Sequence, residues 1–386
     1  MANTNLANAK TGKNDEFYTQ YPDIQKEINA YLEYDPDVFR GKTVLLPCDD
    51  PEWSNFTKFF AQNFEAFGLK KLISTSYAVE SKRIKDWQPT FFETDSPYYD
   101  ADKSRTNGKI FVLDKDVNGD GRFNIDDLQW SYLKDDGDFR SDEVKALRDE
   151  ADIIVTNPPF SLFREFVAWL IEAEKQFVII GHQNAISYKE VFPLIKDNKM
   201  WFGIGFTGGA AHFISNYQDI ATAGNHIEGM IRVSGVVWFT NIDHGRRHEP
   251  LPLMTMEDNI MYSKHKEVRG KGYRHYDNYD AIEVPFTDAI PIDYEGVMGV
   301  PISFLDKYCP EQFEILGITK TWNGLASKIY PEQIQISKGG KESRVTKLND
   351  GASIKLDKEL ENETYYIVNG EMFKQVYARI LIRKKQ

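Results

Sequence analysis

The sequence places an amide and two prolines where a run of aliphatic residues ends. Residues 151–160 read ADIIVTNPPF, so Asn157, Pro158, Pro159 and Phe160 directly follow a stretch that is typical of a buried strand. Proline rings fix φ and restrict the backbone, so the Pro158 carbonyl and the Asn157 side-chain oxygen can serve as two acceptors aimed at one point. Such a pair suits a planar ligand that carries an NH2 group, and Phe160 could lie flat against its ring.

This set of groups suits methyl transfer to an exocyclic ring nitrogen. The lone pair of such a nitrogen is delocalised, and two acceptors that hold its hydrogens would localise it toward a methyl donor. Positioning and electrostatics would then supply most of the rate, without a strong base. The alternative is a Pro-Pro turn that only ends a strand before a helix. The place of the motif at the end of a buried strand, with an aromatic residue next, favours the catalytic interpretation.

An acidic turn at residues 116–127 has the spacing of an EF-hand calcium loop. In DVNGDGRFNIDD, oxygen-bearing groups fall at loop positions 1, 3, 5, 7, 9 and 12, and Gly121 stands at position 6. Position 12 is Asp instead of Glu and the preceding segment is strand-like, so a turn that satisfies its own backbone is an equal alternative. Residues 125–134 could form a helix after the loop. The candidate ligands of a structural calcium ion are Asp116, Asn118, Asp120, the Arg122 carbonyl, Asn124 and Asp127.

Positive charge is concentrated in two short segments of a chain whose net charge is −12. Residues 264–276 carry five Lys or Arg against one Glu, whereas residues 95–152 carry 16 Asp or Glu against nine Lys or Arg. A charged run is usually a solvated surface, but after a catalytic domain we favour phosphate contacts. Tyr273 and Tyr276 could stack on bases. The candidate DNA-binding residues are Arg246, Arg247, Lys264, Lys266, Arg269, Lys271 and Arg274.

The elements that must position these residues alternate along the first half of the chain. Five short aliphatic runs are typical of buried parallel strands, and the two segments between them with helical spacing would pack on the sheet. The second of these segments carries its apolar stripe at Phe163, Phe166, Val167, Leu170 and Ile171. The predicted strands lie at residues 42–48, 70–77, 108–114, 151–157 and 175–181, and the predicted helices at 52–68 and 160–175.

This alternation predicts a doubly wound, Rossmann-like α/β sheet, whose ligands bind beyond the carboxyl ends of its strands. Two more strands, at residues 197–205 and 231–242, would close a first domain at residues 1–245. Residues 246–386 would form a smaller recognition region with a helix-like segment at 300–312 and a strand-like segment at 313–318.

Cysteine content and hydropathy indicate a cytoplasmic protein. Cys48 and Cys309 are the only cysteines and have no metal-ligand spacing, which favours a reducing compartment. The N-terminal residues show no apolar core of a secretory signal, and no apolar stretch approaches the roughly 20 residues that span a bilayer.

Several segments look like the motifs of one family, in that family's order. NPPFSLFREFV (157–167) resembles its catalytic motif, GKNDEFYTQ (12–20) its upstream cofactor motif, CDDPEWSNF (48–56) its first motif and DGDFRSDE (136–143) its third. Two C-terminal segments, 300–318 and 377–385, are similar as well. The family is that of the EcoRI-type adenine-specific DNA methyltransferases.

The resemblance implies transfer of a methyl group from S-adenosylmethionine to the N6 amino group of an adenine flipped out of duplex DNA. Such an enzyme would serve restriction-modification, with a cognate endonuclease as partner, or epigenetic marking. By the same resemblance Asp138 would receive the cofactor's adenine amino group and Phe139 would pack on its ring. The cofactor-binding residues it implies are Asp15, Phe17, Tyr18, Asp49, Asp50, Pro51, Ser54, Asn55, Tyr77, Asp138, Phe139 and Asn157.

Two alternatives to this function stay open. Paired acceptors would also serve an RNA adenine or a protein glutamine amide as substrate. A catalytically silent DNA-binding module is the other alternative, because the segment CDDPEWSNF lacks the glycines that usually let the cofactor approach the backbone. Binding of S-adenosylmethionine would separate the silent module from the enzymes.

Overall fold

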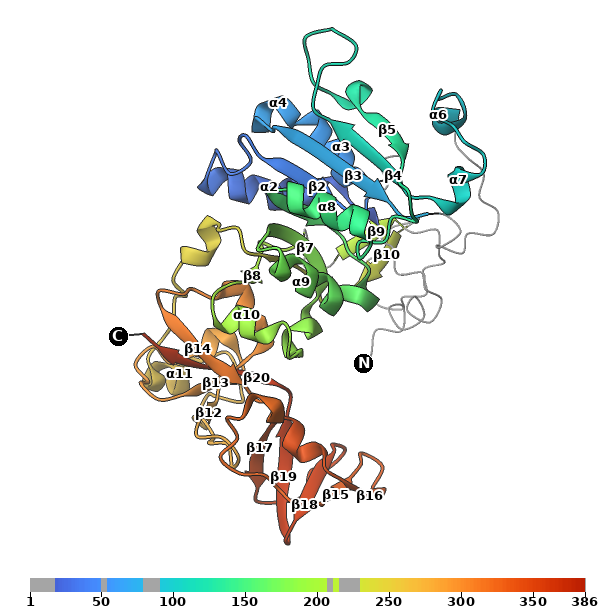
Figure 1. Ribbon diagram of the computed structural model, residues 1–386. Coiled ribbons are helices and arrows are strands. Elements are labelled where there is room, and N and C mark those ends of the chain that lie inside the picture. Colours follow the sequence, from blue (N-terminus) through green and yellow to red (C-terminus); the bar gives the residue numbers. More distant parts are fainter. Residues whose placement is uncertain (1–17, 50–53, 79–90, 207–210, 215–229, 386) are drawn as a thin grey trace. The chain divides into compact units, whose positions relative to one another are not determined.

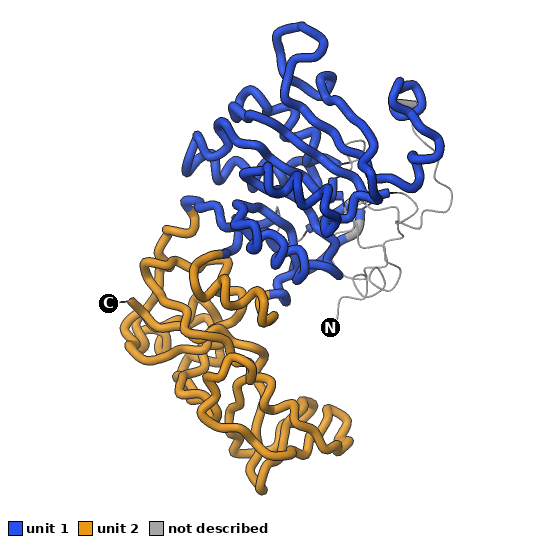
Figure 2. The backbone as a smooth tube through the Cα atoms, viewed as in Figure 1, with its two compact units in different colours: residues 1–185, 200–245 blue, residues 186–199, 246–386 orange. Residues whose placement is uncertain are grey.

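The chain folds into two units, which Figure 2 shows in different colours. The first unit comprises residues 1–185 and 200–245, and the second comprises residues 186–199 and 246–386. The structure is a computed structural model, and it describes residues 18–49, 54–78, 91–206, 211–214 and 230–385.

A mixed sheet of eight strands forms the centre of the first unit (Figure 1). The strand order is β5-β4-β3-β2-β6-β7-β11-β8, and the four middle strands β3, β2, β6 and β7 are parallel. Valine, leucine and isoleucine side chains of β2 and β6 are fully buried, as expected for strands covered on both faces. The strands are β2 (Thr43–Leu46), β3 (Lys71–Ser76), β4 (Lys109–Leu113), β5 (Gln129–Tyr132), β6 (Ile153–Thr156), β7 (Gln176–His182), β8 (Trp201–Phe202) and β11 (Val236–Thr240).

Strand β4 runs opposite to the direction that the sequence predicts. It pairs with β3 in the antiparallel sense, and not in the parallel sense expected of all five aliphatic runs. Lys109, Phe111 and Leu113 are buried, whereas Ile110 and Val112 between them are half-buried. This alternation is typical of an antiparallel strand with one well-covered face.

Strand β5 occupies a segment for which the sequence suggested a helix. After a short 3-10 turn at Ile125–Asp127, residues Gln129–Tyr132 pair with β4. Trp130 is buried and its neighbours Gln129 and Ser131 are exposed, so the burial has the period of two that defines a strand. Because Trp130 stacks on Phe111 with ring centroids 6.2 Å apart, the strand packs on its neighbour β4.

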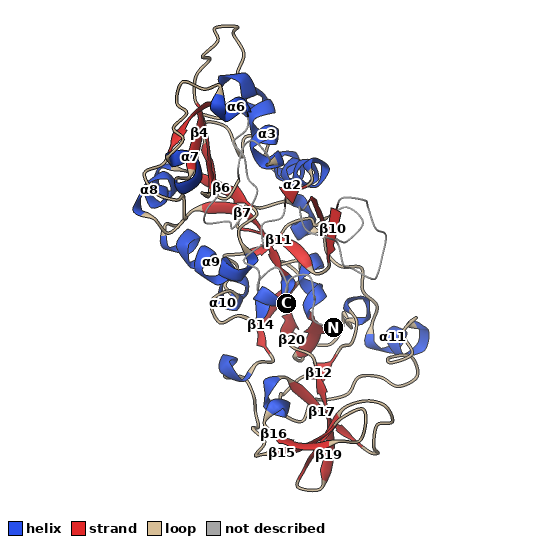
Figure 3. Cartoon of the chain, turned by 90° about the vertical axis from the view of Figure 1, so that its right-hand side faces the viewer, coloured by secondary structure: helices blue, strands red, loops and turns tan. Residues whose placement is uncertain are grey.

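Helices cover both faces of this sheet (Figure 3). Helices α2 (Tyr21–Tyr34) and α3 (Asn55–Gln62) lie on one face, and α8 (Asp142–Glu150) and α9 (Phe163–Glu172) lie on the other. The predicted stripe of α9 is buried at Phe163, Phe166, Val167 and Leu170, while Ile171 is half-buried. No helix in the described ranges is long and apolar enough to cross a membrane. The shorter helices of the unit are α4 (Phe64–Phe67), α6 (Phe91–Thr94) and α7 (Lys103–Thr106).

A small antiparallel sheet accompanies the central one. It has the order β1-β9-β10, with β1 at Tyr18–Thr19, β9 at Ala211–Ile214 and β10 at Met230–Val233. Strands β10 and β11 are separated by a turn at Gly235, whose φ is +74°. The single strand predicted at 231–242 is therefore two strands of two different sheets, because a glycine allows the chain to turn there.

The second unit contains two further sheets. Their strand orders are β12-β13-β20-β14 and β16-β15-β18-β19-β17, and the segment predicted as a helix at 300–312 contributes the end of β13 and a 3-10 turn at Ile302–Lys307. Strand β14 confirms the strand-like segment 313–318. The elements are α10 (Phe192–Lys196), α11 (Met256–Tyr262), β12 (Ile282–Glu283), β13 (Met298–Pro301), β14 (Phe313–Ile318), β15 (Gln333–Ile336), β16 (Glu342–Val345), β17 (Ala352–Leu356), β18 (Tyr365–Val368), β19 (Glu371–Val376) and β20 (Arg379–Lys384).

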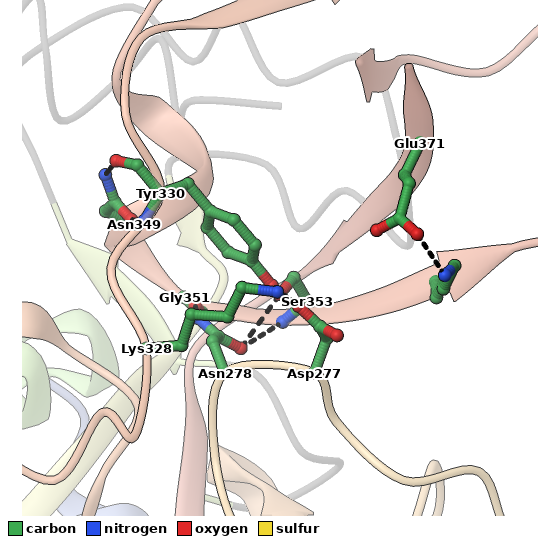
Figure 4. A network of polar contacts seen from close by, with 9 residues as sticks. Asp277, Asn278, Lys328, Tyr330, Asn349, Gly351, Ser353 and Glu371 are labelled. Carbon is green, nitrogen blue, oxygen red and sulfur yellow. Dashed lines mark hydrogen bonds and ion pairs between the residues drawn. The ribbon is translucent and has the colours of Figure 1, made fainter. Parts of the chain in front are cut away.

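A polar network connects the segment before β12 to strand β17 (Figure 4). The Asp277 carboxylate accepts from Lys328 Nζ and from Tyr330 Oη, both at 2.7 Å. Asn278 Oδ1 accepts from the backbone N–H of Ser353 at 2.8 Å and from its hydroxyl at 2.9 Å. Buried polar groups stabilise a fold when their hydrogen bonds are satisfied, so this network fixes the chain where the basic segment 264–276 ends.

Candidate active site

The carboxyl ends of β2, β3, β6 and β7 lie at one edge of the central sheet. The parallel register pairs Leu45 of β2 with Ile154 of β6, and Thr156 of β6 with Ile179 of β7. Strands β3 and β4, which follow β2 in the sequence, lie on one side of β2 in the sheet. Strands β6 and β7, which come later, lie on its other side. The boundary between β2 and β6 is therefore the topological switch point, where open α/β sheets bind their ligands.

Asn157, Pro158, Pro159 and Phe160 leave β6 at this edge. Asn157 follows Thr156, the last residue of the strand, and is half-buried, whereas Pro158 is buried. Phe160 begins a 3-10 turn that leads into α9, and its half-buried ring packs against the hydrophobic core. The motif thus stands between a buried strand and a buried helix, which hold its backbone from both sides.

Asp49 is buried just beyond β2 and is hydrogen-bonded to three neighbouring elements. Its Oδ1 accepts from Ser54 Oγ at 2.8 Å and its Oδ2 from Thr156 Oγ1 at 2.7 Å. Its backbone carbonyl accepts from Ser74 Oγ at 2.5 Å, and its backbone N–H donates to the Thr75 carbonyl at 3.1 Å. The resemblance assigned Asp49 to the cofactor, and the structure adds a direct link from this residue to the end of β6.

The start of α3 is linked to strand β1. Ser54 caps the helix by accepting from the Phe56 N–H at 3.1 Å, and Asn55 Nδ2 donates to the Thr19 carbonyl at 2.8 Å. Tyr18 lies beside Thr19 in β1, and Tyr77 is half-buried just beyond β3. Of the other implied cofactor residues, Asp15, Phe17, Asp50 and Pro51 lie outside the described residues.

Asp138 and Phe139 follow a glycine turn before α8. Two Arg140 nitrogens bind the Asp138 carboxylate, at 2.9 Å for Nε and 2.6 Å for Nη2. Burial raises the pKa of Asp138, but the hydrogen bonds and charge of Arg140 outweigh it, so the net pKa is lowered. The Phe139 ring is buried against Phe166 and Trp169 of α9, with centroids 5.1 and 5.7 Å away. The structure therefore places the Asp138 carboxylate at a half-buried position against Arg140 and the Phe139 ring in the core.

These groups fit a nucleoside cofactor that carries hydroxyl and amino groups. The Thr19 side chain is only 2% exposed, and its Oγ1 has no hydrogen-bond partner among the described residues. A buried hydroxyl usually has a partner, so this atom can serve a polar ligand beside Asn55. The described residues that the resemblance assigns to the cofactor at this end of the sheet, Tyr18, Asp49, Ser54, Asn55 and Tyr77, lie in β1, at the start of α3 and just beyond β2 and β3.

Sequence reasoning did not single out the polar residues at a fourth strand end of the same edge, that of β7. Residues His182, Gln183 and Asn184 leave β7 beside the Asn157 motif, and His182 Nδ1 accepts from the Asn184 N–H at 3.1 Å. Burial lowers the pKa of His182, and a hydrogen bond to the Ser234 backbone only partly opposes this. The sequence does contain a signal for these residues: three polar residues follow the aliphatic run 175–181, just as Asn157 follows the aliphatic run before it.

The acidic loop 116–127 directs its side-chain oxygens at its own backbone. The two oxygens of Asp116 accept from the N–H groups of Gly119 and Gly121, at 2.6 and 2.8 Å. Asp127 Oδ1 accepts from the N–H groups of Val117 and Asn118, at 2.9 and 3.2 Å. Within the described ranges, no three His, Cys, Asp or Glu side chains form a group that could hold a metal ion. The side-chain oxygens of this loop therefore satisfy its own backbone, as the turn interpretation expects, and the calcium site stays a prediction.

We expect that calcium does not bind to this loop and does not change the stability of the protein. Calorimetric titration to millimolar calcium should show no binding heat, and the melting temperature should stay within about 1 °C, because the carboxylates already have donors. The control is the Asp116→Asn/Asp120→Asn variant, which should respond like the wild type. A calcium-dependent rise in melting temperature that this variant lacks would establish the ion site.

The seven candidate DNA-binding cations differ in their surroundings. Arg247 is only 6% exposed and its guanidinium binds the Asn198 side chain, so it is a structural residue of the second unit. Lys264 is exposed but forms an ion pair with Asp288 at 2.7 Å. Arg246 is half-buried. The remaining cations are exposed and have no ion pair within the described residues: Lys266, Arg269, Lys271 and Arg274.

The two tyrosines expected to stack on bases are instead structural. Tyr273 donates its hydroxyl to the Ala289 carbonyl at 2.6 Å, and Tyr276 is buried with its hydroxyl on Glu283. Glu283 in turn binds Arg379 Nη2 at 2.7 Å. These hydrogen bonds anchor the basic segment within the second unit, and its exposed cations stay at the surface.

Comparison with known proteins identifies the class of the molecule. A sequence profile described as "Adenine-specific methyltransferase EcoRI" matches residues 5–385. The type II methyltransferase M.EcoRI of Escherichia coli is 43% identical over 323 residues, which cover 82% of this chain and 89% of that protein. M.MpnI of Mycoplasma pneumoniae is 33% identical over 314 residues, covering 80% of this chain and 83% of that protein. M.MgeORF184P of Mycoplasma genitalium is 32% identical over 384 residues, 98% of each chain.

The protein is thus a methyltransferase with a mixed α/β catalytic sheet. It belongs to the family of EcoRI-type adenine-specific methyltransferases, as the motifs of the sequence indicated. No solved structure matches the chain.

Proposed function

We propose that the protein transfers a methyl group from S-adenosylmethionine to the N6 amino group of an adenine that is flipped out of duplex DNA. The observation that carries the proposal is the position of Asn157 and Pro158, which leave the buried strand β6 at the switch point of the sheet. The names of the relatives as type II methyltransferases support a role in restriction-modification. A cognate endonuclease would then be the partner of this protein.

In this mechanism the protein's own groups orient the amino nitrogen. The Asn157 side-chain oxygen and the Pro158 carbonyl would accept hydrogen bonds from its two N–H groups, and Phe160 would support the base ring. One proton would leave the nitrogen after the methyl group has been transferred. Because β6 and α9 hold the motif, these acceptors need little reorganisation during the reaction. The cofactor, when bound, supplies an electrophilic methyl group; Thr19, Ser54, Asn55 and Tyr77 are the described residues that would hold it. Extrusion of the base would cost a few kcal/mol.

DNA would be bound in part by the four exposed cations of the basic segment that form no ion pair in the described structure. We expect the variant Lys266→Gln/Arg269→Gln/Lys271→Gln/Arg274→Gln to bind duplex DNA more weakly. The slope of log K against log salt concentration is negative, and its magnitude should fall by about 3 to 4, since each lost phosphate contact removes roughly 0.9. Fluorescence anisotropy at several salt concentrations measures this slope.

The matched control removes four exposed cations of the first unit that likewise form no ion pair among the described residues: Lys70, Lys115, Arg122 and Lys134. It changes the net charge equally and should leave the slope within about 1 of the wild type. Equal slopes for the two quadruple variants would contradict the assignment of residues 264–276 to DNA contact.

The experiment that tests the proposed reaction supplies tritiated cofactor to the purified protein with three acceptors. We expect label on duplex DNA, and nuclease digestion should release it as N6-methyladenine. Label on RNA or on protein glutamine instead would replace the proposed substrate. Absence of both cofactor binding and transfer would favour the silent DNA-binding module.

A further inference from the structure

The buried carboxylate of Asp49 connects the two sides of the candidate site. One oxygen accepts from Ser54, which caps helix α3, and the other accepts from Thr156, which is bonded directly to Asn157. Asp49 and Thr156 are 107 residues apart in the sequence. The Asp49 side chain is 6% exposed and that of Thr156 is fully buried, so water hardly competes for these hydrogen bonds.

The backbone of Asp49 is fixed as firmly as its side chain. Its N–H donates to Thr75 and its carbonyl accepts from Ser74, so β3 holds the residue from the other side. Ser74 Oγ also lies 2.8 Å from Thr57 Oγ1 of α3. A residue restrained at both its backbone and its carboxylate resists displacement, and it therefore helps to fix the end of β6 together with the pairing of Thr156 with Ile179 of β7.

We propose that Asp49 is a positioning residue for methyl transfer, which sets the Asn157-Pro158 acceptors relative to the start of α3 through the Thr156 hydroxyl. The inference rests on the proposed function, since it assigns the acceptors to Asn157 and Pro158. It differs from the direct contact with the cofactor that the resemblance assigns to Asp49, because the two hydroxyls that the carboxylate accepts from belong to the protein's own Ser54 and Thr156. A direct ligand would govern cofactor affinity, whereas a positioning residue governs the rate of the bound complex.

The test replaces Thr156 with Val, which keeps the shape of the side chain and removes the hydroxyl. We expect kcat to fall about 10- to 100-fold, because a displacement of about 1 Å in reacting groups has an effect of that size. The dissociation constant of S-adenosylmethionine, measured by calorimetry, should stay within about threefold. Thr156→Ser restores the hydroxyl and should recover kcat to within about threefold of the wild type.

Thr240→Val is the matched control. Thr240 is also a fully buried threonine of the central sheet, and its hydroxyl donates to the Phe177 carbonyl at 2.8 Å at the start of β7, away from the carboxyl edge. This variant should lose stability but keep kcat. The proposal would be overturned if Thr156→Val kept the kcat of the wild type, or if Thr156→Val and Thr240→Val lost kcat equally. It would also be overturned if Thr156→Ser did not recover the rate.

Hydrogen exchange separates this inference from the proposed reaction. Backbone amides of Asn157 and of residues 160–163 should exchange at least about tenfold faster in Thr156→Val and at the wild-type rate in Thr240→Val, whatever the substrate is. Unchanged exchange in Thr156→Val would contradict the positioning role. Absence of adenine methylation by the wild type would contradict only the proposed reaction.

Discussion

Replacing Asn157 with Ala is expected to lower kcat for adenine methylation by about 10²- to 10³-fold, because it removes one of two acceptors aimed at the reacting amino group. The affinity for S-adenosylmethionine should change little, because Thr19, Ser54, Asn55 and Tyr77 are proposed to hold the cofactor and Asn157 would add at most one further contact. The half-buried side chain follows β6 and is not part of it, so the variant should fold. Steady-state kinetics on duplex DNA, with calorimetry of cofactor binding, measures both quantities.

Asn63→Ala is the control for this variant. Asn63 is also a half-buried asparagine of the first unit, and its amide donates to the Phe59 carbonyl at 2.8 Å at the end of α3. Asn63→Ala should keep kcat within about twofold of the wild type, because Asn63 lies at the opposite end of α3 from Ser54. A similar kcat in Asn157→Ala and Asn63→Ala would exclude Asn157 from the chemistry.

A second large effect is expected on the pH dependence of the stability of the first unit, and it arises from Glu27, a buried residue of α2. Its carboxylate accepts from Tyr31 Oη at 2.5 Å and from the Ile204 N–H at 3.0 Å, so the helix holds the loop that follows β8. Burial raises the pKa of Glu27 from 4.5 to about 7, although these hydrogen bonds oppose the rise. Gly203 makes this approach feasible, since a Cβ there would lie 1.7 Å from the carboxylate.

The pH dependence follows from the raised pKa of Glu27. The folded state binds its proton more tightly than the unfolded state, so this group's contribution to stability is fully present below pH 4.5 and is lost as pH rises to about 7. The loss is on the order of 3 kcal/mol, since each pH unit between the two pKa values contributes about 1.4 kcal/mol. Above that range the contribution no longer changes.

Glu27→Gln should remove this part of the pH dependence. The amide that replaces the carboxyl does not titrate, so the change in unfolding free energy between pH 5 and pH 8 should be smaller than in the wild type by roughly 2 to 3 kcal/mol. Urea denaturation at the two pH values measures the difference, and Glu33→Gln, at an exposed position of the same helix, is the control. An identical pH dependence in Glu27→Gln and the wild type would show that the carboxylate is not perturbed.

The elements around Asn157 could be predicted because their signals are local. Strands β2, β3, β6 and β7 are short aliphatic runs, and the stripe of α9 follows the helical period. A polar residue at the end of such a run marks the carboxyl edge of a parallel sheet. The Asn157 motif could therefore be placed from sequence, and the same logic would have found His182.

Features that depend on distant partners could not be predicted. The direction of β4 depends on the path of the chain after β3, which the composition of the strand does not encode. Arg247 is buried because Asn198, from a separate segment, binds its guanidinium. The bond between Asp49 and Thr156 joins residues 107 positions apart, so no local pattern reveals it.

Adenine methylation through Asn157 can be measured in a host that lacks adenine methylation of its own. The wild-type chain is expressed there and N6-methyladenine is mapped across the genome by long-read sequencing, beside Asn157→Ala produced at the same level. We expect the wild type to methylate one short sequence throughout the genome and Asn157→Ala to leave that sequence unmethylated. Full methylation of the same sequence by Asn157→Ala would contradict the mechanism, and a wild type that leaves adenine unmodified would contradict the proposed reaction.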